Sequence, residues 1–248
     1  MRIRVLGNGG FLNDGLPYNC FCIDDTFLID APPDVMLSLK SRNVDFTGIN
    51  RIFISHFHGD HYFGMPFFVL NLFSHYLHTG DSVRPIQIIG QRGLRKALIQ
   101  IQELATSPDN PSVAFIDRVF RFTEIDSSSE VALDGGRRLI FHEMTHSKPC
   151  YGFSVVEKDE LRLTFLCDTK WSDSIACLLS RRPRLVLCDL NARPGDKIRE
   201  HMSQADIMEK AVPITGTATR YVGVHLWRAA EEGRGPLTYA RVGDEYEI

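Results

Sequence analysis

Short apolar runs alternate with longer amphipathic stretches along most of this chain. A short apolar run bounded by turn-forming residues predicts a buried β-strand, whereas apolar residues spaced three and four apart predict a helix. Strands are expected at residues 3–6, 20–23, 27–29, 51–55, 86–89, 113–116, 119–122, 138–142, 152–156, 161–166, 185–189 and 221–224. Helices are expected at residues 33–42, 60–77, 93–105, 171–179 and 203–211.

Two pairs of these predicted strands lie too close together in the sequence for a crossover helix. Residues 20–29 turn around Asp24-Asp25 and residues 152–166 turn around Lys158-Asp159, so both segments are expected to form antiparallel hairpins. Other strands are separated by predicted helices, and the whole pattern predicts a layered α/β protein with mixed sheets. Because the composition never shifts sharply enough to mark a linker, residues 1–248 are expected to form one domain.

The composition, with 44% hydrophobic and 24% charged residues, is that of an ordinary globular protein. No apolar run approaches the ~20 residues of a membrane-spanning helix, and the first residues predict a strand rather than a signal peptide. We therefore expect a cytoplasmic protein with no membrane partner. The net charge of −3 argues against a nucleic-acid-binding surface that depends on a broad positive field. The six cysteines, several of them inside apolar segments, are expected to be reduced.

The segment HFHGDH at residues 56–61 directly follows a predicted strand and is the strongest chemical signal in the chain. Neutral imidazole is a ligand for zinc, copper, iron and nickel, and a carboxylate suits harder divalent ions. On an extended backbone His56 and His58 point the same way. Asp60 and His61 are adjacent and diverge, so they do not easily serve the same ion as that pair. The spacing therefore predicts two metal ions side by side.

Further residues of ligand type follow other predicted strands. They are Asp30, His146, Asp168, Asp189 and His225. Each alone is a weak signal, but together with the HFHGDH segment they predict that several strand ends converge on one site. His142 lies close to His146 and is an alternative ligand, although its position within a predicted strand suits a core or edge residue better.

With these residues in this order, the sequence resembles the metallo-β-lactamase superfamily. The HxHxDH segment is highly specific for it, and His146, Asp168 in FLCDT and His225 follow in the expected order. The resemblance covers most of the chain. It implies a four-layer αβ/βα sandwich with two mixed sheets and a site along one edge of those sheets.

The resemblance also implies a ligand set for two divalent metal ions. His56, His58 and His146 would hold one ion, Asp60, His61 and His225 would hold the other, and Asp168 would bridge them. Such donors suit two Zn²⁺ ions, or Mn²⁺ or Fe in some homologues. A metal-bridged hydroxide would be the nucleophile, because coordination lowers the pKa of water from ~15.7 toward ~7. Asp60 would be catalytic as well as a ligand, by orienting that hydroxide.

Within the superfamily, the sequence is most similar to the phosphodiesterase branch, which contains ribonuclease Z and the phosphoribosyl cyclic phosphodiesterase. The segments THSKPCYGF around His146, LCDTKW around Asp168 and EHMSQAD around His201 carry this similarity. In that branch a histidine at the position of His201 lies near the phosphate, which implies that His201 protonates or stabilises the leaving group. The alternative is an exposed histidine at a helix start. The resemblance also allows a homodimer.

These observations favour a metal-dependent hydrolase of a small phosphodiester such as a cyclic phosphate or a nucleotide. An RNA endonuclease like ribonuclease Z is the first alternative, but no long Gly/Pro-rich arm for gripping tRNA is visible between His61 and His146. Hydrolysis of a thioester, lactone or β-lactam is the second, and it would leave His201 without an obvious role. A metal-stabilised scaffold would not need every ligand position filled.

Overall fold

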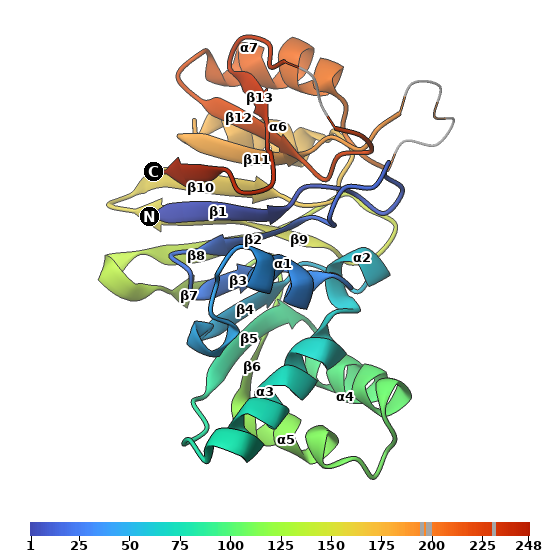
Figure 1. The fold of residues 1–248 in the computed structure, drawn as a ribbon. Helices are drawn as coiled ribbons and strands as arrows, with labels where there is room; N and C mark the ends of the chain where they lie inside the picture. The colour runs from blue at the N-terminus through green and yellow to red at the C-terminus, as the bar shows by residue number, and fades with distance from the viewer. Residues whose placement is uncertain (194–195, 197–199, 230–231) are drawn as a thin grey trace. The chain divides into compact units, whose positions relative to one another are not determined.

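The chain forms two compact units in the computed structural model, which describes residues 1–193, 196, 200–229 and 232–248. The amino-terminal unit comprises Met1–Gly7, Pro17–Ile125 and Gly243–Glu247. The carboxy-terminal unit comprises Asn8–Leu16, Asp126–Val242 and Ile248. Each unit contains one seven-stranded mixed sheet flanked by helices (Figure 1). The single domain predicted from the sequence stays a prediction.

The sheet of the amino-terminal unit has the strand order β14-β1-β2-β3-β4-β5-β6. Its strands are β1 (Arg2–Gly7), β2 (Cys20–Ile23), β3 (Phe27–Ile29), β4 (Arg51–Ile54), β5 (Ile86–Gln91), β6 (Phe120–Ile125) and β14 (Glu245–Glu247). Strands β14 to β3 are antiparallel, and β3 to β6 are parallel. The predicted hairpin of β2 and β3 is confirmed, and both Asp24 and Asp25 in its turn have the left-handed φ that aspartate tolerates.

Helices flank this sheet. They are α1 (Val35–Ser41), the 3₁₀ turn η1 (Phe46–Gly48), α2 (Gly59–Tyr62), α3 (Met65–Thr79), α4 (Leu94–Ala105) and α5 (Pro111–Val119). In Figure 1, α3, α4 and α5 lie together, and each of them contacts the other two. Their buried side chains, including Phe68, Leu72 and Leu98, join Ile52 and Ile88 of the sheet in one hydrophobic cluster.

One predicted element of this unit is wrong. Residues 113–116 were expected to form a strand, but they lie inside α5. The side chain of Asn110 accepts a hydrogen bond from the Ser112 backbone N–H, and Pro111 occupies the first turn, where its missing N–H costs nothing. The short apolar run is compatible with both a strand and a helix. The Asn-Pro-Ser segment before it, which is typical of a helix start, distinguishes the two.

The sheet of the carboxy-terminal unit has the strand order β13-β12-β11-β10-β9-β8-β7. Its strands are β7 (Glu130–Ala132), β8 (Arg138–Glu143), β9 (Tyr151–Glu157), β10 (Glu160–Leu166), β11 (Leu185–Asp189), β12 (Arg220–Val224) and β13 (Leu237–Tyr239). Strands β7 to β10 are antiparallel and β10 to β13 are parallel. Its helices are the 3₁₀ turn η2 (Asp134–Gly136), α6 (Asp173–Ser180), the π-helix η3 (Asp206–Ala211) and α7 (Val212–Thr215). The hairpin around Lys158-Asp159 is confirmed.

The parallel registers bring the polar strand ends of each unit together. In the amino-terminal sheet Ile29 pairs with Phe53, so Asp30 lies beside the segment that follows β4. In the carboxy-terminal sheet Leu166 pairs with Cys188, and Asp189 pairs with Val224. The residues after β10, β11 and β12 therefore leave their sheet at neighbouring points. Each unit consequently has its own cluster of ligand-type residues.

Candidate metal centre

In the amino-terminal unit, the turn between β4 and α2 folds two histidines onto each other. Nε2 of His56 lies 3.0 Å from Nδ1 of His58. His56 is fully buried, and its ring centroid is also 4.2 Å from that of His61. Two imidazole nitrogens this close to each other can contact a single ion. The extended backbone at His58, with φ −71° and ψ 151°, produces this arrangement before the helix begins.

Asp60 and His61 supply a second pair of donor atoms in the same cluster. Both stand on the single turn of α2, where Nε2 of His61 lies 3.4 Å from Oδ2 of Asp60. Both side chains are buried. The pair thus adds two donor atoms to the cluster, and His61 also has a ring nitrogen within 4.8 Å of one of His56. The separation of this pair from His56 and His58 stays a prediction.

Asp30 orients this cluster through contacts with His61 and Ser55, a role that its position at a strand end did not indicate. Its Oδ2 lies 2.8 Å from Nδ1 of His61 and accepts a hydrogen bond from the Ser55 hydroxyl, while Oδ1 accepts from the Ser55 backbone N–H. The same hydroxyl lies 3.1 Å from Nδ1 of His56. With Nδ1 held by a carboxylate, the Nε2 atom of His61 is left to act as a ligand. Asp30 is fully buried and has a φ of +59°, in the left-handed region that aspartate tolerates.

In the carboxy-terminal unit, Asp168 presents one oxygen to each of two histidines. Oδ2 lies 3.9 Å from Nε2 of His146, and Oδ1 lies 3.5 Å from Nε2 of His225. Asp168 follows β10, whereas His225 follows β12 and His146 follows β8. A carboxylate whose two oxygens face two different imidazoles has the geometry of a bridging ligand.

Asp189 at the end of β11 holds two histidines at once. Its Oδ2 lies 2.7 Å from Nδ1 of His201, and its Oδ1 lies 3.1 Å from Nδ1 of His225. The same carboxylate accepts hydrogen bonds from the backbone N–H groups of Thr169 and Asn191. Although the donor atoms of Asp168, Asp189, His201 and His225 lie within 4.8 Å of one another, Asp189 is already satisfied by four protein groups. We therefore interpret it as an orienting residue rather than a ligand.

His225 has an unusual backbone conformation and lies close to the backbone of Gly10. His225 has a φ of +55°, which is uncommon for a histidine. A Cβ atom added to Gly10 would lie 1.9 Å from Nδ2 of Asn191 and 2.9 Å from Cε1 of His225. Gly10 of the LGNGG segment is therefore glycine because the imidazole and the amide pass directly over its backbone.

The pKa values of two histidines shift in opposite directions. Burial lowers the pKa of His201, but the charge of Asp189 and the hydrogen bond to it outweigh burial, and the pKa is raised overall. Burial lowers the pKa of His146 more than the nearby Asp168 carboxylate raises it. A raised pKa suits a proton donor, and a lowered pKa suits a ligand, which must bind metal in its neutral form.

His142, the alternative to His146, is used by the sheet instead. Its Nε2 lies 2.9 Å from the hydroxyl of Ser154 on β9, which in turn lies 2.9 Å from the hydroxyl of Thr164 on β10. Burial lowers the pKa of His142 to about 4. These contacts from His142 through Ser154 to Thr164 give His142 a structural role on β8 that needs no metal ion.

The donor atoms in both clusters fit divalent metal ions. They are imidazole nitrogens and carboxylate oxygens on buried or half-buried side chains, and the imidazoles of His61 and His225 are each held at Nδ1 by a carboxylate. Zn²⁺, Mn²⁺ and Fe all accept such donors. The sequence prediction of a divalent-metal protein agrees with these clusters, whereas the number and identity of the ions stay predictions.

Comparison with known proteins agrees with the fold and the clusters. The family model described as anti-Pycsar protein Apyc1 matches residues 1–210. Ribonuclease Z of Agathobacter rectalis is 27% identical over 128 residues, which are 52% of this chain and 38% of that protein. Ribonuclease BN of Salmonella typhi is 30% identical over 112 residues, which are 45% of this chain and 32% of that protein. The matched segments thus span about a third of these two relatives.

Solved structures extend the similarity to the whole chain. The metallo-β-lactamase fold protein YhfI from Bacillus subtilis superposes with a TM-score of 0.75 at 15% identity, covering 99% of this chain and 98% of that one. Human tRNase Z, short form, gives 0.71 at 23% identity, with 100% and 99% covered. Yeast PDE1 gives 0.68 at 12% identity, with 98% of each chain covered. The predicted metallo-β-lactamase fold and the predicted relationship to ribonuclease Z are confirmed.

Proposed function

Because this chain belongs to the anti-Pycsar protein Apyc1 family, we propose that it is a dinuclear metal-dependent phosphodiesterase that hydrolyses a small phosphodiester, such as a cyclic phosphate or a nucleotide. The coarser statement, a metallo-hydrolase of the metallo-β-lactamase fold related to ribonuclease Z and Apyc1, rests on the comparisons. The observation that supports phosphodiesterase activity in particular is the pairing of His201 with Asp189 beside the carboxylate of Asp168.

The metal ions would be held as the sequence predicts. One ion would be bound by His56, His58 and His146, the other by Asp60, His61 and His225, and both by Asp168. Close donor pairs within the amino-terminal unit and the two-sided placement of Asp168 within the carboxy-terminal unit support this assignment. Two divalent ions, Zn²⁺ by preference with Mn²⁺ or Fe as alternatives, would supply an activated water near pH 7 and neutralise charge on the phosphoryl oxygens.

His201 would donate the proton that the departing alkoxide needs. Asp189 holds the Nδ1 atom and raises the pKa, so the Nε2–H of the imidazolium is directed away from the carboxylate and is available to a substrate oxygen. Asp60 would have a second role, to orient the attacking water. A phosphodiester requires such an acid when its leaving group is an alkoxide, whereas the tetrahedral intermediate of thioester hydrolysis expels a better leaving group.

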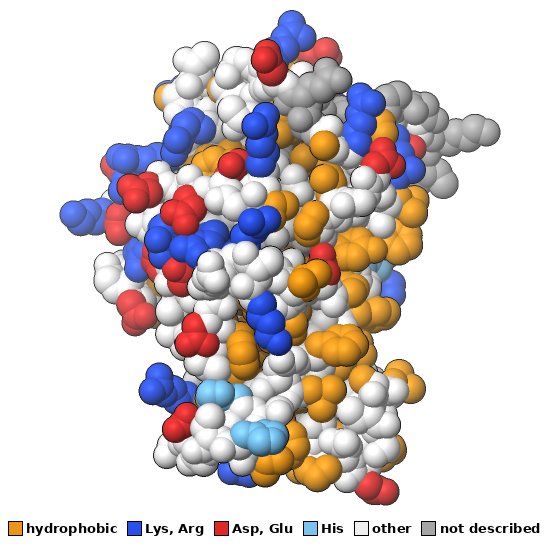
Figure 2. All heavy atoms as spheres, in the orientation of Figure 1, with side chains coloured by type: hydrophobic (Ala, Val, Ile, Leu, Met, Phe, Trp, Pro, Cys, Tyr) orange, Lys and Arg blue, Asp and Glu red, His pale blue; other side chains and the backbone are white. Residues whose placement is uncertain are grey.

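A small substrate is favoured over RNA. The net charge is −3, and Figure 2 shows acidic and basic side chains interspersed over the face in view rather than a broad positive surface. The tRNA-gripping arm expected for a ribonuclease Z is not visible in the sequence. RNA endonuclease activity remains the second candidate because curated relatives named ribonuclease Z and ribonuclease BN match the chain.

Two predictions concern the protein beyond its site. No helix among the described residues has the length and apolarity needed to span a membrane. A cytoplasmic location and a homodimer stay predictions from the sequence and from the family resemblance.

The test is a substrate panel on metal-replete protein with the metal content measured. It contains bis(p-nitrophenyl) phosphate, cyclic phosphates and cyclic nucleotides, a precursor tRNA, a thioester and a chromogenic β-lactam. We expect hydrolysis of the small phosphodiesters and its loss after chelation. Hydrolysis of only the thioester or the β-lactam would refute the phosphodiesterase proposal, and hydrolysis of only the tRNA would favour the second candidate.

A further inference from the structure

A cavity in the carboxy-terminal unit adjoins the cluster around His201. Its volume is about 860 Å³, and Ser203 and Leu226 are among the residues that line it. Ser203 stands two residues after His201, and Leu226 directly follows His225. The cavity therefore lies beside the chain segments that carry His201 and His225. Nothing in the catalytic proposal above uses this space.

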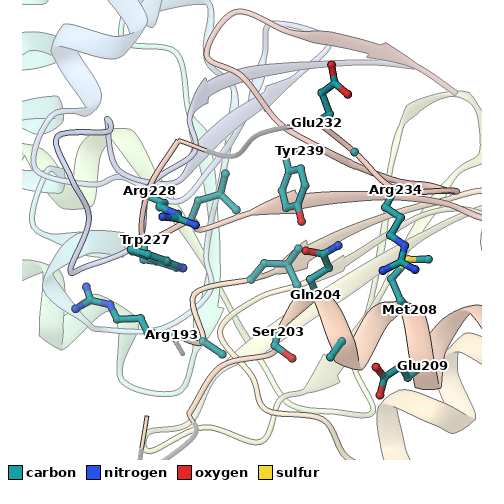
Figure 3. Close-up of a pocket in the computed structure, with 15 residues that line it drawn as sticks. Arg193, Ser203, Gln204, Met208, Glu209, Trp227, Arg228, Glu232, Arg234 and Tyr239 are labelled. Atoms are coloured by element: carbon teal, nitrogen blue, oxygen red, sulfur yellow. The ribbon is translucent and has the colours of Figure 1, made fainter. Parts of the chain in front are cut away.

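One wall of the cavity is an indole ring with arginines against it. The guanidinium carbon of Arg228 lies 4.4 Å from the ring centroid of Trp227, and that of Arg193 lies 6.0 Å from it. Figure 3 shows these three residues on one side of the cavity and Arg234 on the opposite side. A guanidinium group over an aromatic face keeps the N–H donors along its own edge available to a ligand in the plane of the guanidinium.

The hydrogen-bonding side chains of the cavity lie between these two walls. Tyr239, Gln204 and Ser203 occupy this position in Figure 3. Two carboxylates also line the cavity, those of Glu209 and Glu232. Figure 3 shows the Glu232 carboxylate pointing away from Tyr239 and Gln204. The interior thus offers polar contacts with an excess of arginine over glutamate.

The cavity arginines differ from many surface arginines of this protein in their partners. Arg95 pairs with Asp117 at 2.6 Å, for example, and Arg184 pairs with Glu160 at 3.0 Å. Within the described part of the chain, neither Arg228 nor Arg234 forms an ion pair with a carboxylate. Their positive charges are consequently not neutralised by the cavity itself, and arginine is well suited to bidentate binding of phosphate and carboxylate.

Resting on the phosphodiesterase function proposed above, we propose that this cavity binds the leaving-group part of the substrate and that this part carries an oxyanion, either a phosphate or a carboxylate. The guanidinium groups of Arg228 and Arg234 bind the oxyanion, and Trp227 forms the wall against which the rest of the group packs. The substrate would then carry a second anionic group besides the diester that the metal ions engage.

Binding can be measured without catalysis because the sequence has two tryptophans. The second, Trp171, lies against Lys210 and is not among the cavity residues, so Trp171→Phe leaves Trp227 as the only indole reporter. Metal-replete Trp171→Phe protein is titrated with glucose 6-phosphate, glucuronate and uncharged glucose. We expect one or both anions to change the Trp227 emission with a Kd of about 1 mM or tighter, and glucose to leave it unchanged. The tighter anion identifies the oxyanion.

The arginines are tested by the double substitution Arg228→Gln and Arg234→Gln in the same background. We expect the anion to bind at least about tenfold more weakly, because a hydrogen bond to a charged group contributes that much or more. Arg182→Gln, on an exposed turn outside the cavity, is the matched control and should bind as the parent does. Calorimetric titration repeats the measurement independently of the indole, and thermal melts verify that each variant is folded.

The outcomes separate the two proposals. No emission change with either anion, or equal affinity in the double variant and the Arg182→Gln control, would overturn the anion subsite. If the subsite is correct, the double variant lowers kcat/KM for a diester that bears a second phosphate or carboxylate and spares bis(p-nitrophenyl) phosphate; an equal loss on both would overturn it. A wild-type protein that hydrolyses no diester but binds the anion at Arg228 and Arg234 would overturn the phosphodiesterase function instead.

Discussion

Replacing Asp189 by asparagine removes one charge and keeps the shape of the side chain. The carboxylate accepts from two backbone N–H groups and faces the Nδ1 atoms of His201 and His225. An amide has one oxygen, so whichever way it is turned, one backbone N–H and one imidazole face its NH₂ group instead of an acceptor. The substitution therefore removes the acceptor of either His201 or His225, and it removes the negative charge beside both.

The size of the effect follows from these contacts. Leaving one buried N–H without an acceptor costs about 1–3 kcal/mol of stability. Loss of the charge lowers the pKa of His201, because the charge of Asp189 and its hydrogen bond are the two largest contributions that raise it. Loss of a general acid costs about 10²- to 10⁴-fold in rate, whereas a displaced second-shell partner of a metal ligand costs about 10- to 100-fold. We therefore expect Asp189→Asn to lower kcat/KM about 100-fold or more on a diester with an alkoxide leaving group.

The assay compares two leaving groups. A p-nitrophenolate departs without protonation, so hydrolysis of bis(p-nitrophenyl) phosphate should fall only through displacement of His225, by about 10- to 100-fold at most and by less than hydrolysis of the alkoxide diester. His201→Ala should show the same dependence on the leaving group while retaining both metal ions. Asp159→Asn, on the exposed turn between β9 and β10, is the matched control. Equal losses on the two substrates in Asp189→Asn would refute the proton-donor role, and loss of metal in His201→Ala would make His201 a ligand.

Three further outcomes are expected. Asp168→Ala should lose at least one metal ion by elemental analysis, because its two oxygens face two histidines, and unchanged metal content would contradict the bridge. Gly10→Ala should lower metal affinity about 10- to 100-fold in a chelator competition by displacing His225, and wild-type affinity would contradict the close approach. The pKa of His142 falls from 6.5 to about 4 on folding, so protonation of this residue favours the unfolded state. The contribution of neutral His142 to stability is therefore complete above pH 6.5 and is lost as the pH falls toward 4. From these values His142 alone should lower the free energy of unfolding by about 2 kcal/mol between pH 7 and pH 5, measured by urea unfolding, and His142→Gln should remove that part of the pH dependence; an unchanged pH dependence in the variant would contradict the shift.

The sequence alone determined the parts of the site that are local in the chain. Residues 56–61 lie within one strand end, one turn and one helical turn, so their spacing by itself fixes which donor atoms can meet. The two hairpins were predictable for the same reason, because Asp24-Asp25 and Lys158-Asp159 mark turns between apolar runs. Where a local pattern matched two periods, as at residues 113–116, the prediction was wrong, and the capping residue Asn110 decided the outcome.

The tertiary structure decided the roles of the residues that support the ligands. By their place at strand ends, Asp30 and Asp189 do not differ from Asp168, and only the family resemblance singled out Asp168 as a ligand. Asp30 became an orienting residue because the register of β3 and β4 places it behind His61, and Asp189 because β11 lies between β10 and β12. Strand pairing joins positions far apart in the chain, and no local periodicity encodes which strand is the neighbour. Candidate ligands could therefore be proposed from the sequence, whereas the hydrogen bonds that orient each imidazole depend on the order of strands in the sheet.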